Sequence, residues 1–228
     1  MKHGVVFTIV TGEKDTTRIP YHNPDWDYFY FTDIRKKDID PWQCVGLTKE
    51  VEEYGRRKAS RLYKINPNNH RILKEYEYQL YFDGTIEMTG DPENLIPLMN
   101  GKDLALYKHP NRNCIYVEAK HVINREREDP KVVNDVVTKY KEDGYPPDNG
   151  LATCTIILRK NTPEIEKLNT YWWHHFENGS RRDQLSFNYC CWKLGIKYAM
   201  FPGTFNRMEP HFKKYPHLIP PTITDFDF

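Results

Sequence analysis

The chain has 228 residues, and its 33 lysines and arginines nearly cancel its 32 aspartates and glutamates, which leaves a net charge of +1. This length suits one sheet-based domain, and without a strong positive field the chain is not expected to bind nucleic acid or an anionic membrane. Aromatic residues, at 14% of the chain, can build a core, and no apolar run approaches the ~20 residues of a membrane span.

The N-terminal part predicts two buried strands. Residues 5–10 form a β-branched apolar run that is too short for a signal-peptide core and leads into a polar loop at Thr11 and Gly12. Residues 28–32 form an aromatic run that ends at Asp33. The five cysteines are odd in number and lack CxxC spacing, so together with the absence of a leader they predict a reduced, cytoplasmic protein.

Helix and strand patterns alternate along the rest of the chain. Residues 48–64 carry good helix formers and stop at Asn66-Pro67, and residues 76–82 alternate like a strand that runs into Asp83-Gly84. A short helix is predicted over 91–99 and a short strand over 104–107. In the second half the signals predict helices between Pro130 and Gly144, from Thr162 to Phe176 and over 181–194, with a strand over 151–158.

This alternation predicts an α/β fold whose layers surround a mainly parallel sheet. We expect one domain over residues 1–215, followed by a proline-rich tail or linker over 216–228. In such sheets ligands bind beyond the carboxyl ends of the strands, so Thr11-Gly12, Asp33 and Asp83 are expected to converge.

Asp83 is the first candidate for chemistry. A carboxylate at the end of a buried strand can hold a divalent cation against a diphosphate, and Gly84 lets the backbone come close. Oxygen ligands suit Mg²⁺ or Mn²⁺, and His211, late in the chain, could complete the metal shell. The alternatives are a solvent-facing hairpin turn at Asp83-Gly84 and a surface role for His211.

Asp183 is the second candidate, in the string Ser180-Arg181-Arg182-Asp183. It could accept a proton from a substrate hydroxyl, and Arg182 or Arg181 could bind phosphate. The alternative is that Ser180 and Asp183 form a helix-start box. Arg61 and Lys64 lie three residues apart, on one side of the first predicted helix. They could meet a diphosphate or form a solvated helix face.

Read in order, these segments resemble a known family. The matching residues are Arg61, Lys64-Ile65-Asn66-Pro67, Asp83-Gly84, Asp91-Pro92, His109-Pro110 with Arg112, Glu118-Ala119, Gly150-Leu151, Trp172-Trp173 and Arg182-Asp183-Gln184-Leu185-Ser186-Phe187. Over roughly residues 5–205 the chain resembles a glycosyltransferase-like family first catalogued as a domain of unknown function, with members in plant mucilage and pectin synthesis and in bacteria. It is also similar to chlorovirus glycosyltransferases that decorate a capsid protein.

The resemblance implies a single GT-A domain, a Rossmann-like three-layer fold with a mixed, mainly parallel sheet that binds a nucleotide sugar with Mn²⁺ or Mg²⁺. Asp83 falls where that fold keeps its metal- and diphosphate-binding carboxylates, with Thr85 in place of the second acid. Asp183 falls where an inverting enzyme places its base.

The function predicted on this basis is transfer of a hexose or deoxyhexose from a UDP-linked donor to a hydroxyl of a glycan or glycoprotein, with inversion. The residues expected to hold the donor are Thr11, Gly12, Asp33, Arg61, Lys64, Asp83, Gly84 and Arg182. The alternative is a non-enzymatic module that binds carbohydrate or single-stranded nucleic acid on exposed tyrosine and tryptophan rings.

Overall fold

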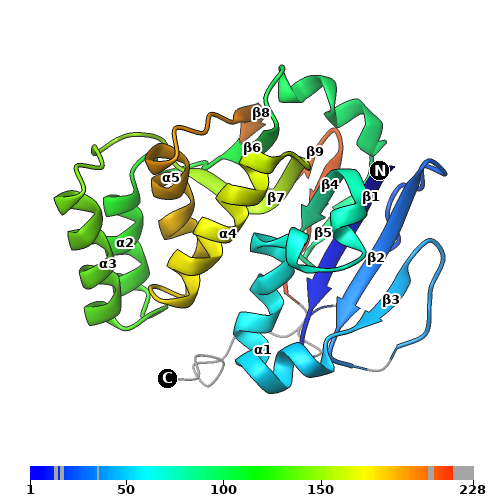
Figure 1. The fold of residues 1–228 in the computed structure, drawn as a ribbon, viewed down its shortest axis with the longest axis horizontal. Helices are drawn as coiled ribbons and strands as arrows, with labels where there is room; N and C mark the ends of the chain where they lie inside the picture. The colour runs from blue at the N-terminus through cyan, green and yellow to red at the C-terminus, as the bar shows by residue number, and fades with distance from the viewer. Residues whose placement is uncertain (13–14, 16–17, 35, 205–207, 218–228) are drawn as a thin grey trace.

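The computed structural model describes residues 1–12, 15, 18–34, 36–204 and 208–217. Its main feature is a seven-stranded sheet with the strand order β3-β2-β1-β4-β7-β6-β8 (Figure 1). In that order the strands are Gln43–Gly46, Trp26–Thr32, Lys2–Val10, Tyr76–Phe82, Ala152–Lys160, Leu104–Lys108 and Ala199–Thr204. Neighbouring strands are parallel except on the two sides of β7, so the sheet is mixed and mainly parallel, as predicted.

The chain reverses its path across the sheet between β1 and β4. Strands β1, β2 and β3 follow one another outward, and the chain then returns through helix α1 (Thr48–Ile65) to place β4 on the other side of β1. Phe7 of β1 pairs with Phe29 of β2 on one side and with Tyr81 of β4 on the other, so the three carboxyl ends lie side by side. Open α/β sheets bind their ligands at such a switch point.

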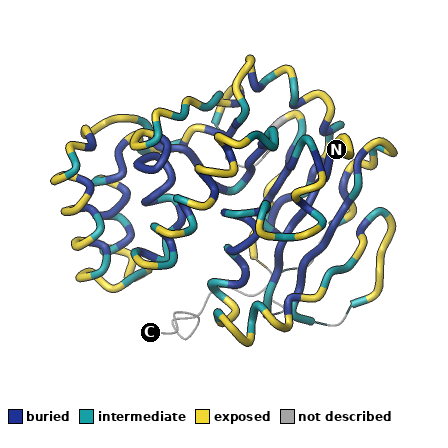
Figure 2. Tube along the Cα trace, viewed as in Figure 1, coloured by how far each residue is buried: buried dark blue, intermediate teal, exposed yellow. Residues whose placement is uncertain are grey.

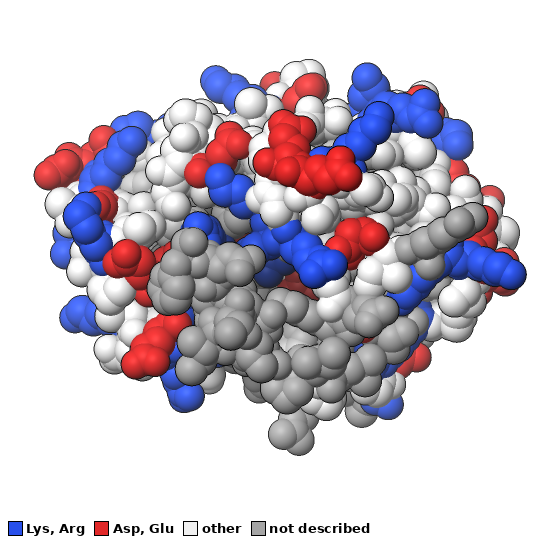
Figure 3. Space-filling model, turned by 90° about the horizontal axis from the view of Figure 1, so that it is seen from below, with Lys and Arg blue, Asp and Glu red and all other residues white. Residues whose placement is uncertain are grey.

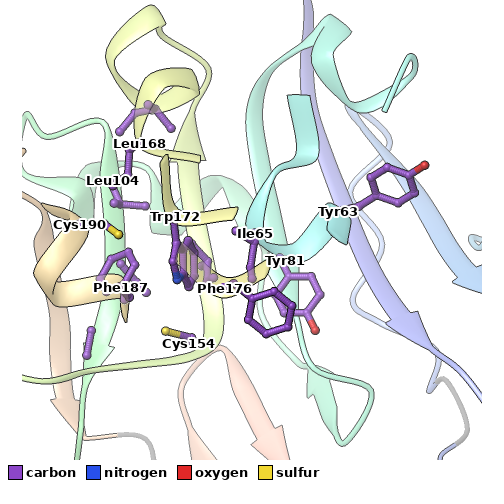
Figure 4. Packing of buried hydrophobic residues seen from close by; sticks show 14 of the residues in the cluster. Tyr63, Ile65, Tyr81, Leu104, Cys154, Leu168, Trp172, Phe176, Phe187 and Cys190 are labelled. Carbon is purple, nitrogen blue, oxygen red and sulfur yellow. The ribbon is translucent and has the colours of Figure 1, made fainter. Parts of the chain in front are cut away.

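One face of the sheet is covered by helices that bury apolar side chains against it. The helices after α1 are α2 (Ile115–Asn124), α3 (Pro130–Glu142), α4 (Pro163–Glu177) and α5 (Asp183–Lys193). In α4 the buried residues Ile165, Leu168, Trp172 and Phe176 recur at helical spacing, as the sequence predicts. Trp172 meets Phe187 of α5 edge to face, with 4.9 Å between the ring centroids (Figure 4). This packing fixes the start of α5 relative to the sheet.

The opposite face carries a small second sheet and two short turns. The sheet consists of β5 (Ile86–Met88), β10 (Phe212–Lys214) and β9 (Met208–Glu209), and the 3-10 turns are η3 (Pro92–Leu95) and η4 (Pro97–Met99). Phe82, Met88 and Phe212 belong to the buried cluster on this side. The elements therefore form three layers, and Figure 2 shows long stretches of buried chain along the central strands.

Most predicted helices and strands are confirmed, and the differences have local causes. The segment 91–99 forms two 3-10 turns instead of one helix, because Pro97 lacks the amide that would continue a helix. Helix α5 begins at Asp183 and not at residue 181. The sequence patterns do not predict β3, α2, β8 or the small sheet, whose strands have only two or three residues each.

The last described residues run back toward the central sheet. The amide of Tyr215 donates to the carbonyl of Thr85 at 2.8 Å, which ties this part of the chain to the segment after Asp83. The predicted tail over 216–228 falls mostly outside the described residues, which end at 217. Within the described part, no helix combines the length and the apolarity needed to cross a bilayer.

Candidate functional site

Asp83 lies at the switch point, where the carboxyl ends of β1 and β4 are neighbours. Its carbonyl accepts from the amide of Ile86 at 2.8 Å, which makes a tight turn, but β5 then pairs with β10 and not with β4. The hairpin interpretation of Asp83-Gly84 is therefore wrong. Gly84 passes so close to β1 that a Cβ added there would lie 2.4 Å from Val10 Cγ2. The predicted close approach of the backbone at Gly84 is thus present.

Lys64 joins Asp83 to Asp183. Its Nζ lies 3.2 Å from Asp83 Oδ1 and 2.7 Å from Asp183 Oδ2, and only 3% of its side chain is exposed. Arg61, one turn earlier in α1, has its Nε 3.8 Å from Asp183 Oδ2. The Tyr81 hydroxyl donates to Asp83 Oδ1 at 2.7 Å. The structure thus brings four predicted site residues from α1, β4 and α5 into one cluster, which we call the Lys64 cluster (Arg61, Lys64, Asp83 and Asp183).

Buried polar contacts hold the backbone around this cluster. Arg159 of β7 is buried, and its Nη2 donates to the carbonyl of Lys64 at 2.8 Å while its Nε donates to Asn169 Oδ1 at 3.1 Å. Trp172 Nε1 donates to the carbonyl of Asp183 at 2.9 Å. The end of α1 and the start of α5 are therefore fixed by side chains of β7 and α4. The sequence patterns do not identify Arg159 as a supporting residue.

The charges of the cluster compensate one another. Burial alone would raise the pKa of Asp183, but the positive charges of Lys64 and Arg61 outweigh it and hold that pKa well below its usual range. Burial alone would lower the pKa of Arg61, but the charges of Asp183 and Asp83 outweigh it and raise that pKa above the usual value. Asp183 is therefore an ionised carboxylate at neutral pH, able to accept a proton.

Thr11, Gly12 and Asp33 meet at a second corner of the same edge. Asp33 Oδ1 accepts from the amide of Gly12 at 2.9 Å, and Oδ2 accepts from Arg56 Nε at 2.7 Å. Thr11 Oγ1 donates to the carbonyl of Arg56 at 3.4 Å. Gly12 has φ +69, a conformation that favours glycine. Asp33 thus holds the loop after β1 in place, in addition to any contact with a ligand.

The start of α5 differs from a helix-start box. Arg182 is the N-cap residue, and its amide donates to Ser180 Oγ at 3.1 Å, while the Asp183 carboxylate faces Lys64. The alternative interpretation of Ser180 and Asp183 as a helix-start box is therefore wrong. Arg182 Nε is buried and has no hydrogen-bond partner among the described residues. The preceding amide, that of Arg181, donates to Glu128 Oε2 at 2.8 Å.

His211 is not brought to Asp83. Its carbonyl accepts from the amides of Thr89 and Gly90, beyond the far end of β5. His217, a second late histidine, has its Nδ1 2.8 Å from Asp15 Oδ2. This hydrogen bond raises the pKa of His217, and the charge of Asp83 acts in the same direction. The prediction for His211 therefore does not fit the structure, because β5 separates it from the cation site expected at Asp83.

The expected metal needs few protein ligands. No group of three or more His, Cys, Asp or Glu side chains with ligand geometry occurs in the described part of the chain. A Mg²⁺-type cation that is bound through substrate phosphates requires only one or two carboxylates from the protein. Asp83, with 27% of its side chain exposed, is compatible with such a site.

The face that contains these residues is positively charged at its centre. Figure 3 views the molecule from the side of the strands' carboxyl ends and shows lysine and arginine side chains gathered there, with acidic side chains around them. This arrangement suits a ligand with phosphate groups.

Comparison with known proteins finds a matching sequence family and a curated relative. The sequence profile of a family described as "TOD1/MUCI70, glycosyltransferase-like domain" matches residues 3–214. An Arabidopsis thaliana protein named "Probable hexosyltransferase MUCI70" is 24% identical over 172 residues, which is 71% of this chain and 29% of that protein. The chain therefore spans about three tenths of the length of this relative.

Among solved structures, the apo structure of the WbbM bifunctional glycosyltransferase is similar to this chain. The TM-score is 0.51 at 8% sequence identity, and the match covers 88% of this chain and 38% of that one. At this identity the likeness concerns the fold alone. It agrees with the predicted GT-A type of fold.

Proposed function

The chain belongs to the TOD1/MUCI70 glycosyltransferase-like family, and on this premise we propose that it transfers a hexose or deoxyhexose from a UDP-linked donor to a hydroxyl of a glycan or glycoprotein, with inversion. The hexosyl part of the proposal is supported by the name of the Arabidopsis relative. The observation that carries it is the Lys64 cluster, in which one buried ammonium contacts the strand-end Asp83 and the helix-start Asp183.

The donor side of the cluster would receive the diphosphate. Lys64 and Arg61 lie beside Asp83 and would neutralise the charge that develops on the leaving group, an effect that usually dominates such catalysis. Asp83 would hold Mn²⁺ or Mg²⁺ together with the phosphates, and the cation would add further charge neutralisation there. The loop of Thr11 and Gly12, fixed by Asp33, would contact the nucleoside, next to the switch point.

Asp183 would act as the general base. In the free protein Lys64 and Arg61 keep the pKa of its carboxyl low, which makes it a weak proton acceptor. A bound diphosphate competes for the same two cations, so we expect it to raise the pKa of Asp183 toward a range that suits proton transfer. The acceptor oxygen, once deprotonated, would attack the anomeric carbon from the side opposite the diphosphate, which inverts its configuration.

The test is a transfer assay on the purified chain with a panel of UDP-sugars, with Mn²⁺ or with chelator, read as UDP release and by NMR of the product anomer. We expect Asp183→Asn to lower turnover by about 10²–10⁴-fold. Asp83→Asn should lower both turnover and cation dependence. Asp25→Asn is the matched control, since Asp25 is exposed and immediately precedes β2 at the opposite edge of the sheet.

Full activity of Asp183→Asn would remove that residue from the role of base. If the wild-type chain binds carbohydrate but turns over no donor, the non-enzymatic alternative gains support instead.

A further inference from the structure

The two oxygens of the Asp83 carboxylate have different surroundings. Oδ1 accepts from the Tyr81 hydroxyl at 2.7 Å and lies 3.2 Å from Lys64 Nζ. Oδ2 has no hydrogen-bond partner in the described part of the chain, and it is not among the buried polar atoms that lack one. Because 27% of the side chain is exposed, Oδ2 is the oxygen that a ligand can reach.

Tyr81 is a buried residue of β4 whose ring is fixed by packing. It is only 1% exposed and belongs to the large hydrophobic cluster under the helices (Figure 4). Its ring centroid lies 5.4 Å from that of Phe7 in β1, and Lys64 Nζ lies 5.3 Å from the same centroid. The hydroxyl therefore approaches Asp83 from a fixed position.

The backbone of Asp83 is fixed as well. Tyr81 and Asp83 are two residues apart in extended chain, so their side chains point to the same face. The amide of Asp83 donates to the carbonyl of Thr155 at 2.9 Å, and the next residue, Gly84, packs closely against Val10. What would remain free is the rotation of the carboxylate about χ2, a torsion with only broad preferences.

The two donors at Oδ1 restrict this rotation. A tyrosine hydroxyl is protonated at neutral pH and is therefore a steady donor to a carboxylate. Lys64 is less exclusive, because its Nζ lies closer to Asp183 Oδ2, at 2.7 Å, than to Asp83. A bound diphosphate would also compete for Lys64, whereas the Tyr81 hydroxyl lies within the core. Tyr81 is thus the partner that keeps Oδ1 turned inward when the donor is bound.

This orientation matters because the expected cation would have few protein ligands. The described residues contain no group of three or more acidic, histidine or cysteine side chains placed to share an ion. A Mg²⁺-type ion requires nearly ideal ligand geometry, and a partner that hydrogen-bonds a ligating carboxylate orients it. Loss of such a partner lowers metal affinity about 10–100-fold.

We propose that Tyr81 is a positioning residue for the cation of the donor site, and that it holds Asp83 Oδ1 so that Oδ2 alone binds the metal. The inference rests on the proposed function, because it assumes a cation between Asp83 and the donor diphosphate. It deepens that function by giving the two carboxylate oxygens separate tasks. The hydroxyl does not bind the ion and acts only through Asp83.

The experiment measures Mn²⁺ binding and needs no turnover. A small amount of UDP is added to excess chain, and EPR follows the signal of free Mn²⁺ during its titration. We expect Tyr81→Phe, which removes only the hydroxyl, to weaken Mn²⁺ binding at least about tenfold. Tyr76→Phe is the matched control, because the Tyr76 hydroxyl donates to Asp27 Oδ2 at the other end of the same strand. Metal-free UDP affinity should be equal in both variants, which also shows that they are folded.

A double variant separates a positioning role from a general structural one. Adding Tyr81→Phe to Asp83→Asn should cause no further loss of Mn²⁺ affinity, since the hydroxyl acts through that carboxylate. Unchanged affinity in Tyr81→Phe, an equal loss in Tyr76→Phe, or a further loss in the double variant overturns the inference.

Failure of the proposed function gives a different result. If the wild-type chain with UDP binds Mn²⁺ no more tightly than UDP alone, the cation site is contradicted and the inference falls with it. If the wild-type chain does not bind UDP at all, the donor site itself is contradicted.

Discussion

Two stretches of the site differ in how their charges are balanced. In the Lys64 cluster each cation has a carboxylate beside it, with Lys64 Nζ 2.7 Å from Asp183 Oδ2. In the groove between α1, α3 and the loop that joins α4 to α5, burial lowers the pKa of Arg57 and the charge of Glu128 opposes this shift. The first stretch is preorganised by its own buried ion pairs, whereas the second is an open groove whose lining carries charges of both signs. The following predictions test that comparison.

The largest effect is expected from Lys64→Met. The substitution leaves two carboxylates without their buried cation, and breaking a buried pair in this way costs about 3–5 kcal/mol. Urea denaturation at pH 7 measures the change. The control is Lys131→Met, whose ion pair with Asp135 is exposed to solvent and is expected to add little to stability. Similar losses in the two variants would contradict a special role for Lys64.

Asp183→Asn should change the pH dependence of stability. The folded-state pKa of Asp183 lies below its unfolded value of about 3.9, so its contribution is complete above that pH and is lost as the pH falls below it. We expect the variant to be about 2 kcal/mol less stable than wild type at pH 7, with the gap narrowing below about pH 4.

Urea denaturation of wild type and variant from pH 3 to pH 7 measures the stability difference at pH 7 and its decrease at low pH. The exposed Asp135→Asn serves as the matched control. A gap that stays constant over the whole range would exclude the ion pair as the cause.

Gly84→Ala tests the contact between β1 and the turn after Asp83. A Cβ at 2.4 Å from Val10 Cγ2 forces the valine side chain or the backbone at Gly84 to shift, which costs about 1–3 kcal/mol. Gly46→Ala is the control, because a Cβ there has nothing within 4 Å, and we expect its effect to stay within about 0.5 kcal/mol. Thermal or urea unfolding compares the two. The double variant with Val10→Ala should lose less than the sum of the single changes, and strict additivity would argue against the contact.

The smallest effect is expected from Arg56→Gln. Arg56 is 64% exposed, so its ion pair with Asp33 contributes only about 0.2–1 kcal/mol to stability. The pKa of Asp33 should nevertheless rise, because Arg56 helps to outweigh the burial of that carboxyl. NMR titration detects this shift, and Lys160→Gln, in the exposed pair with Glu77, should not produce it. An unchanged pKa of Asp33 would show that the Gly12 amide alone holds the carboxylate charged.

The sequence by itself determined most of the local elements and the order of the candidate site residues along them. The spacing of Ile165, Leu168 and Trp172 gave helix α4, because a helix forms when apolar residues recur at its own period. The alternation before Asp83 indicated a strand with a carboxylate at its end. The ordered motifs identified the family whose sequence profile matches residues 3–214.

Only the tertiary structure decided which of these residues act together. The pairing of β5 with β10 decided between the hairpin and the strand-end interpretation of Asp83. The path of the chain around that small sheet places His211 beside Thr89 and Gly90 and not beside Asp83. Lys64 reaches Asp183 because β4 crosses back to the far side of β1 and α4 fixes the start of α5. Local patterns depend on neighbours within a few residues, whereas these contacts join segments that are distant in the sequence and depend on strand order.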